Sequence, residues 1–157
     1  YSLVASNVVC INRGDLFMGK EPVDFEITDY YELLALHKTI MEAKFHPNPR
    51  NRLIFASPIL AGGAERVVEA LAKVDDATPK TNMHSKTWKE WRRAVETNEV
   101  GELCLEQTAS IDEWSDFGIS RKRETATNAL APFLLDELQL EQFIAEVDRR
   151  KRSPGGG

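Results

Sequence analysis

The stretch APFLLDELQLEQFIAEVDRRKR, residues 131–152, predicts a long amphipathic helix. Pro132 stands where a helix begins, because the first turn of a helix needs no N–H donor at that position. Acidic residues lie early in the stretch and basic residues lie late, so the charges complement the helix dipole. The apolar residues recur at helical spacing and form one broad face: Phe133, Leu134, Leu135, Leu138, Leu140, Phe143, Ile144 and Val147. Such a face needs a partner surface, within this domain or on another chain.

Other helices are predicted from apolar residues that recur at i, i+3, i+4 and i+7 and from residues that cap helix ends. Thr28 is the expected cap of the first helix, and Thr87 with Glu90 forms a capping box before another. Glycines at 62 and 63 would weaken a helix that ran through them, so one is expected to begin near Gly63. The predicted helices span residues 28–45, 63–74, 88–97 and 132–152, and Ser110 with Glu113 predicts a short helical turn ended by Gly118.

A β-hairpin is predicted at the N-terminus, within residues 2–18. Both arms are rich in β-forming side chains, and the residues Asn12-Arg13-Gly14-Asp15 between them are typical of a turn. The expected fold is therefore α+β and helix-dominated, with about five helices and a small N-terminal β-hairpin. The predicted core contains Val8, Val9, Leu33, Leu34, Ile40, Val67, Leu71, Trp91, Val95, Leu135, Leu138 and Ile144.

Three segments are less decided by their pattern. Residues 52–56 are compatible with a short third strand, and the following Ser57-Pro58 with the start of a helix. Residues 101–107 fit either a strand or a helix. The basic segment 120–123 is expected to lead into the final helix.

The length of 157 residues suits a single globular domain, which we place at residues 1–152. Residues 153–157, Ser-Pro-Gly-Gly-Gly, are interpreted as a glycine-rich tail or linker. A start at Tyr1 and an end in glycines indicate a processed product or a fragment of a longer chain. No apolar run approaches the length of a membrane span, so we expect no membrane contact.

Cysteine usage favours an intracellular protein, cytoplasmic or nuclear. Cys10 and Cys104 are the only cysteines, which excludes a disulfide scaffold and leaves a single disulfide possible. Two reduced thiols, buried or half-buried, are the favoured interpretation.

Few residues are candidates for a catalytic, metal or cofactor site. The histidines at 37, 46 and 84 do not pair with cysteine or carboxylate at a zinc-ligand spacing, and Gly62-Gly63 lacks the remaining residues of a phosphate-binding loop. We assign no catalytic residue, no metal site and no cofactor, and we expect a non-enzymatic domain.

Basic clusters are the strongest candidates for a binding site, although the net charge is −5. Trp88 and Trp91 interleave with one of them, a combination suited to stacking on bases while cations meet phosphates, but their spacing also fits a packed helix face. If the clusters converge, they form one positive groove. Their members are Arg50, Arg52, Lys86, Lys89, Arg92, Arg93, Arg121, Lys122, Arg123, Arg149, Arg150, Lys151 and Arg152.

Three functions remain open at this stage. The first is a non-enzymatic binding or structural domain of a larger assembly, which docks through an apolar helix face while basic clusters steer an acidic partner. Its partner is another protein or a second copy of this chain. The second is a nucleic-acid (RNA)-binding domain of a nucleocapsid or polymerase. The third is a small hydrolase that depends on a cysteine or on a carboxylate pair.

Overall fold

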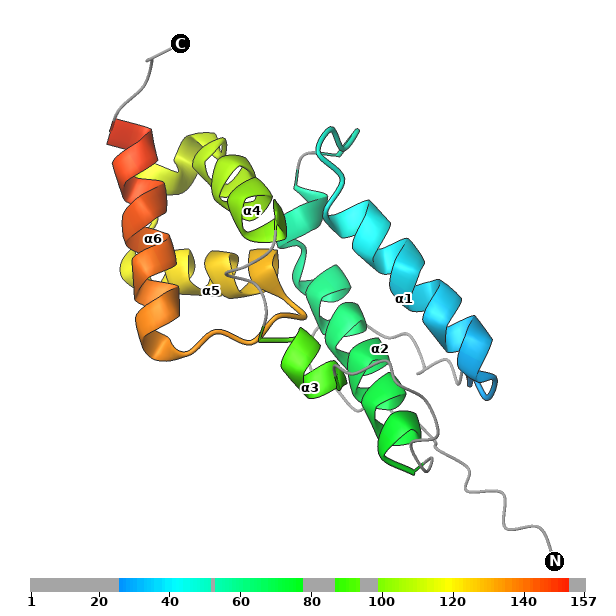
Figure 1. The fold of residues 1–157 in the computed structure, drawn as a ribbon. Coiled ribbons are helices and arrows are strands. Elements are labelled where there is room, and N and C mark those ends of the chain that lie inside the picture. Colours follow the sequence, from blue (N-terminus) through cyan, green and yellow to red (C-terminus); the bar gives the residue numbers. More distant parts are fainter. Residues whose placement is uncertain (1–25, 52, 78–86, 94–98, 153–157) are drawn as a thin grey trace, which may run out of the picture.

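The computed structural model describes residues 26–51, 53–77, 87–93 and 99–152, and these fold as helices joined by short turns, with no strand among them. The predicted helix-dominated fold is confirmed, and the predicted hairpin at residues 2–18 lies outside the described residues. The elements in chain order are α1 (Tyr30–Lys44), the 3-10 turn η1 (Ile54–Ala56), α2 (Pro58–Ala77), α3 (Trp88–Trp91), α4 (Glu99–Ala109), the 3-10 turn η3 (Asp112–Asp116), α5 (Ile119–Leu130) and α6 (Glu137–Arg152) (Figure 1).

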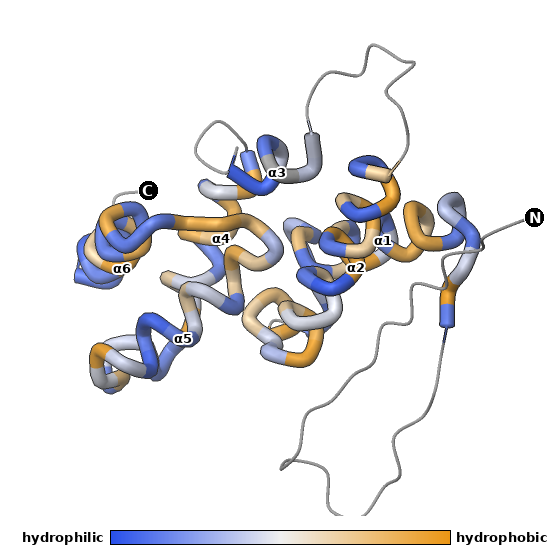
Figure 2. Tube along the Cα trace, turned by 90° about the horizontal axis from the view of Figure 1, so that it is seen from below, coloured by the Kyte–Doolittle hydropathy of each residue, from blue (hydrophilic) through white to orange (hydrophobic). Residues whose placement is uncertain are grey.

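Helices α1 and α2 form an antiparallel pair (Figure 1). The cap of α1 is Asp29, one residue after the predicted Thr28, and its carboxylate accepts hydrogen bonds from the backbone N–H groups of Tyr31 and Glu32. The pair shares a small core of buried residues from both helices: Leu33, Ile40, Ala64, Val67 and Leu71. Hydrophobic residues of α1 and α2 therefore pack against each other. Figure 2 shows that both helices carry apolar positions, drawn in orange.

Helix α2 runs straight through Gly62 and Gly63, so the predicted start near Gly63 is wrong. It begins at Pro58, and the backbone N–H of Ala61 donates to the carbonyl of Ser57 over 2.9 Å. Each glycine costs a helix about 1 kcal/mol. Burial of the apolar face, which includes Ala61, outweighs that cost. The segment 52–56, which was also compatible with a strand, forms the 3-10 turn η1 at residues 54–56 instead.

A second and larger core lies among η1, η3, α4, α5 and α6. The 3-10 turn η1 contacts α1, α2, α4 and α5, so it stands at the junction between the α1–α2 pair and the C-terminal helices. Phe55 of η1 and Trp114 of η3 are almost fully buried in this core. The open segment 101–107 belongs to α4, and the basic segment 120–123 lies in the first two turns of α5 rather than leading into the final helix.

The final helix begins at Glu137, five residues after the predicted start at Pro132. Pro132 instead follows a cis peptide bond in a buried turn. The helix start is fixed by a reciprocal pair: the Asp136 carboxylate accepts from the Gln139 N–H over 2.8 Å, and the Gln139 side-chain oxygen accepts from the Asp136 N–H over 2.9 Å. Arg92 holds the preceding turn, because its Nε donates to the carbonyl of Pro132.

The two predicted capping boxes have different outcomes. Thr87 and Glu90 form theirs at the start of α3, although the described part of that helix ends at Trp91, with residues 94–98 outside the described residues. Ser110 does not cap η3, since its hydroxyl donates back to the carbonyl of Gln107. The Ser110 hydroxyl therefore satisfies a carbonyl in the last turn of α4 instead.

Candidate interaction surface

Helix α6 has one packed face and one free face. Phe143, Ile144 and Val147 are buried against the C-terminal core. On the opposite side lies the outer stripe, a set of six exposed residues that falls within an arc of about 100° around the helix axis. The residues of the outer stripe are Leu138, Glu141, Gln142, Ala145, Arg149 and Arg152. Figure 1 shows α6 at the edge of the molecule, with its neighbours on one side only.

Leu138 is 62% exposed, so the prediction that it belongs to the core is wrong. The stretch 131–152 carries more apolar side chains than one packed helix face takes up. Leu135 and Phe143 are partly or fully buried, whereas Leu134 is also exposed. Leu138 is thus the one large apolar side chain on the free face of α6.

Arg150 joins α6 to α4. Its guanidinium donates to both carboxylate oxygens of Glu102, over 2.7 and 3.0 Å, and its Nε donates to Glu146 over 2.9 Å. Glu146 also accepts two hydrogen bonds from Arg149. The hydrogen bonds from Arg149 and Arg150 lower the pKa of Glu146 from 4.5 to about 2. The guanidinium of Arg150 is therefore held by α4 and α6 and is not free to bind a ligand.

Asp148 accepts hydrogen bonds from side chains of two other elements. Trp114 of η3 and Lys122 of α5 both donate to its Oδ1 oxygen over 2.7 Å. Burial acts to raise the pKa of Asp148, but the hydrogen bonds from Lys122 and Trp114 outweigh it, and the pKa lies below the ordinary value. Asp148 thereby fastens the basic segment 121–123 to α6.

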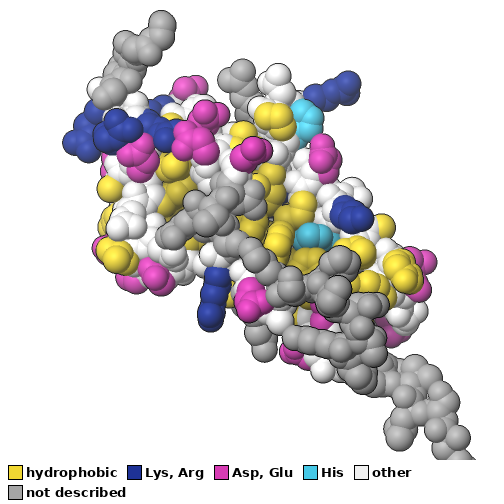
Figure 3. Space-filling view, in the orientation of Figure 1, with side chains coloured by type: hydrophobic (Ala, Val, Ile, Leu, Met, Phe, Trp, Pro, Cys, Tyr) yellow, Lys and Arg dark blue, Asp and Glu magenta, His cyan; other side chains and the backbone are white. Residues whose placement is uncertain are grey.

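The structure therefore brings Lys122 of the cluster 121–123 next to the cluster 149–152. It places Arg123 near the N-terminal end of α6, and carboxylates lie among these basic residues. Arg123 pairs with Glu137 of α6, and Arg121 pairs with Glu124 of its own helix. Figure 3 shows basic side chains at the C-terminal end of α6 with acidic side chains directly beside them. The joint cluster is a mosaic of both signs and not a uniformly positive groove.

The other predicted basic residues lie elsewhere. Arg50 is exposed in the turn after α1, and Arg93 is exposed just after α3, where Arg92 is engaged with Pro132. Lys89 lies on α3. Arg52 and Lys86 fall outside the described residues.

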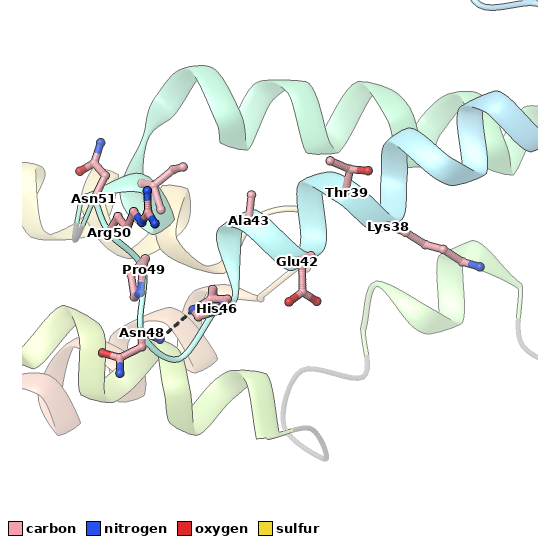
Figure 4. Close-up of a pocket in the computed structure, with 10 residues that line it drawn as sticks. Lys38, Thr39, Glu42, Ala43, His46, Asn48, Pro49, Arg50 and Asn51 are labelled. Atoms are coloured by element: carbon pink, nitrogen blue, oxygen red, sulfur yellow. Dashed lines mark hydrogen bonds between the residues drawn. The ribbon is translucent and has the colours of Figure 1, made fainter.

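A hollow of about 860 Å³ lies beside the outer face of α1 and the turn that follows it. Lys38, Glu42, His46 and Arg50 contribute charged or titratable groups to its lining. Figure 4 shows Lys38 and Arg50 at opposite ends, with Glu42 between them and His46 accepting a hydrogen bond from the N–H of Asn48. Because the two cations do not converge, the hollow does not form an anion site.

The aromatic cluster around α3 is closed. The rings of His37, Trp88 and Trp91 pack edge to face, with centroids 5.0 to 5.5 Å apart. At these distances the rings touch, so no base or cation fits between them. Burial first, and Lys38 second, lower the pKa of His37, whose Nε2 has no hydrogen-bond partner among the described residues. The packing interpretation of the two tryptophans is the one that this geometry supports.

Lys44 was not among the residues that the sequence singled out as a candidate for any role. Lys44 is fully buried, and its ammonium donates to three backbone carbonyls, those of Phe55, Asn128 and Ala129. Burial lowers its pKa from 10.5 to about 8. No sequence signal marks this role, because a lysine near a helix C-terminus is ordinary.

Cys104 lies beside Lys44 in the core. It is fully buried, and burial raises the pKa of its thiol from 9.0 to about 12, although nearby Lys44 lowers it in part. Its Sγ donates weakly to the carbonyl of Ala129 over 3.6 Å. Such a thiol is poorly ionised and shielded from reagents.

Over the described ranges, no cluster of histidine, cysteine and acidic residues is arranged to hold a metal ion. In the same ranges, no helix combines the length and the apolar character needed to span a membrane. In comparisons with known proteins, this chain matches no family model, no curated protein and no solved structure.

Proposed function

We propose that this chain is a non-enzymatic binding domain of a larger assembly and that it docks a protein partner through the outer stripe of α6. The observation that carries the proposal is the exposure of Leu138, 62%, on a helix whose opposite face is already packed. A single exposed apolar side chain is ordinary, so the proposal depends on the place of Leu138. It lies in one stripe with the exposed Ala145 and with exposed arginines, as in an amphipathic helix that docks by one face. The exposed arginines at 149 and 152 extend the stripe and steer an acidic partner surface.

The thiol version of a hydrolase is less well supported. Cys104 is buried and its pKa is raised to about 12, whereas a nucleophilic cysteine needs an accessible thiolate near neutral pH.

Site-specific photo-crosslinking in the expressing cell tests the docking proposal. A photoreactive amino acid at Leu138 should give protease-sensitive adducts, whereas the same group at Ile59, 72% exposed on α2, serves as the matched control. Protein adducts at position 138 without adducts at position 59 support the proposal. Equal labelling at both positions, or no protein adduct at 138, contradicts it.

A nucleic-acid-binding domain remains the second candidate, favoured by the exposed basic residues Arg121, Arg149 and Arg152 on neighbouring elements. Adducts at position 138 that are sensitive to nuclease would favour it. Titration of a labelled single-stranded RNA should then show an affinity that falls steeply with salt, because neutralised phosphates release counterions.

A further inference from the structure

We propose that the outer stripe of α6 binds the same stripe of a second copy of this chain, with the two helices antiparallel and crossing at Ala145. The inference rests on the proposed function, since it names the partner of the same surface. It is carried by the order of residues along the stripe.

The charges of the stripe are separated by sign along the helix. Glu141, which lies 4.0 Å from Arg123 of α5, is exposed in the N-terminal half, and Arg149 and Arg152 are exposed in the C-terminal half. A parallel pairing of two copies would set like charges side by side. An antiparallel pairing sets acidic residues against basic ones at both ends.

Ala145 is the centre of this arrangement. Glu141 precedes it by four residues and Arg149 follows it by four, so a two-fold axis at Ala145 brings Glu141 next to the partner's Arg149. Leu138 precedes Ala145 by seven residues and Arg152 follows it by seven. The same axis therefore lays Leu138 against the aliphatic stem of the partner's Arg152.

The small side chain at the centre allows close approach. Ala145 is exposed, and two helix axes approach to about 8 Å only where the residues at the crossing are small. An unrelated protein would not require the chain's own charges to be balanced about one alanine. RNA would be repelled by the exposed carboxylate of Glu141 within the stripe. A stripe that complements itself is the mark of an isologous contact.

The extent of the stripe predicts a weak dimer. Helix α6 has 16 residues and is therefore about 24 Å long, so one crossing buries less than the roughly 1,200–2,000 Å² of a standard interface. We expect a rapid monomer–dimer equilibrium that shifts toward monomer as salt is added, because exposed ion pairs are screened.

Sedimentation equilibrium of the full chain tests the pairing with two charge reversals, Glu141→Arg and Arg149→Glu. Each variant alone sets like charges together twice and should weaken the dimer about tenfold or more. Mixed in equal amounts, the two variants should associate with each other, since opposite charges then face at both positions. Lys73→Glu on α2 is the control for charge, and thermal unfolding checks that each variant is folded.

A bulky residue at the crossing gives an independent test. Ala145→Arg should abolish the dimer, since the two copies would collide at the axis, and it should leave the melting temperature almost unchanged at this exposed position. A strictly monomeric wild type would overturn the inference. A dimer that none of the three variants on α6 weakens, or a mixture that stays dissociated, would overturn it as well.

The failure of this inference is distinguishable from the failure of the proposed function. Protein adducts from position 138 in the cell, together with a monomeric pure chain, would leave the docking role intact and assign the stripe to another protein. A monomeric pure chain together with no protein adduct at position 138 would contradict both proposals.

Discussion

Lys44, in the last turn of α1, donates a hydrogen bond to the carbonyl oxygen of Ala129, in the last turn of α5, over 3.0 Å. The same ammonium donates to Asn128 and to Phe55 of η1. The last carbonyls of a helix lack partners within the helix, so Lys44 supplies donors to the negative end of α5. No carboxylate among the described residues forms an ion pair with it. This buried cation therefore ties the α1–α2 pair to the C-terminal core.

Replacement of Lys44 with Met should destabilise the domain. Methionine fills similar space but leaves three carbonyl oxygens without their donor. Leaving a buried polar group unpaired costs roughly 1–3 kcal/mol. Removal of the buried charge, which burial disfavours, returns part of that loss. We expect the free energy of unfolding in urea to fall by about 2–4 kcal/mol. Lys73→Met, on the exposed side of α2, is the control, and an equal loss there would refute the role of Lys44.

The stability of the domain should rise between pH 8 and pH 9, the window set by the Lys44 pKa of about 8 and the ordinary cysteine value of 9.0. In this window the folded state has begun to lose the Lys44 proton, while the unfolded state, with a pKa near 10.5, still binds it. The unfolded state therefore binds more protons at this site, which raises the free energy of unfolding by about 1 kcal/mol across the window. Ionisation of the Cys104 thiol in the unfolded state offsets about a third of it, so the net rise should be about 0.6 kcal/mol. Above pH 9 the Cys104 thiol is mostly ionised in the unfolded state, and its opposite slope then cancels the remaining contribution of Lys44. Urea titrations at the two pH values measure the rise, which Lys44→Met should remove.

Leu138 and Phe143 should respond very differently to truncation. Leu138 is 62% exposed, so Leu138→Ala should change the free energy of unfolding by no more than about 0.5 kcal/mol. Phe143 is buried in the C-terminal core, so Phe143→Ala should cost about 3–5 kcal/mol. Chemical denaturation of the two variants side by side is sufficient. Similar losses for both would mean that α6 packs through a different face.

The thiol of Cys104 should resist alkylation in the folded domain. It is fully buried and its pKa is raised to about 12, so little thiolate exists near neutral pH. In a Cys10→Ser variant, iodoacetamide should label the chain only after urea is added, as intact mass spectrometry will report. Rapid labelling without urea would restore the thiol hydrolase as a candidate.

Removal of the Asp136 side chain should loosen the start of α6. Asp136→Ala loses the hydrogen bond to the Gln139 N–H, and loss of such a cap costs about 1 kcal/mol. Amide hydrogen exchange at residues 137–140 should accelerate, while exchange at Val147 should remain slow. Pro132→Ala is the informative comparison. If amide exchange at residues 137–140 accelerated in Pro132→Ala and not in Asp136→Ala, the helix would begin at Pro132, as the sequence pattern predicts.

Local signals account for the features that the sequence predicted correctly. The periodic apolar residues of α1 and the capping box of Thr87 and Glu90 lie within a few residues of one another, so the sequence alone shows them. The start of α6 was mistaken because Pro132 is compatible with a first helical turn, while the pair Asp136 and Gln139 fixes the start five residues later. Two competing local signals were present, and the reciprocal hydrogen bonds decided between them.

The sequence predicted only part of the candidate surface. Spacing on α6 predicted an apolar face, and it correctly included Phe143, Ile144 and Val147. It did not separate Leu138 from them, because the width of a buried stripe depends on how neighbouring helices approach. The position of α5 and α4 on one side of α6 leaves Leu138 in solvent.

By itself the sequence determined the helical character of the chain and the polarity of α6, since these follow from residues three or four positions apart. The tertiary structure alone decided which cations are free. Arg150 meets Glu102 across 48 residues of sequence, and Lys44 meets Ala129 across 85. A charge reveals its partner only when the chain has folded, because Coulombic and hydrogen-bond energies depend on separation in space and not along the chain.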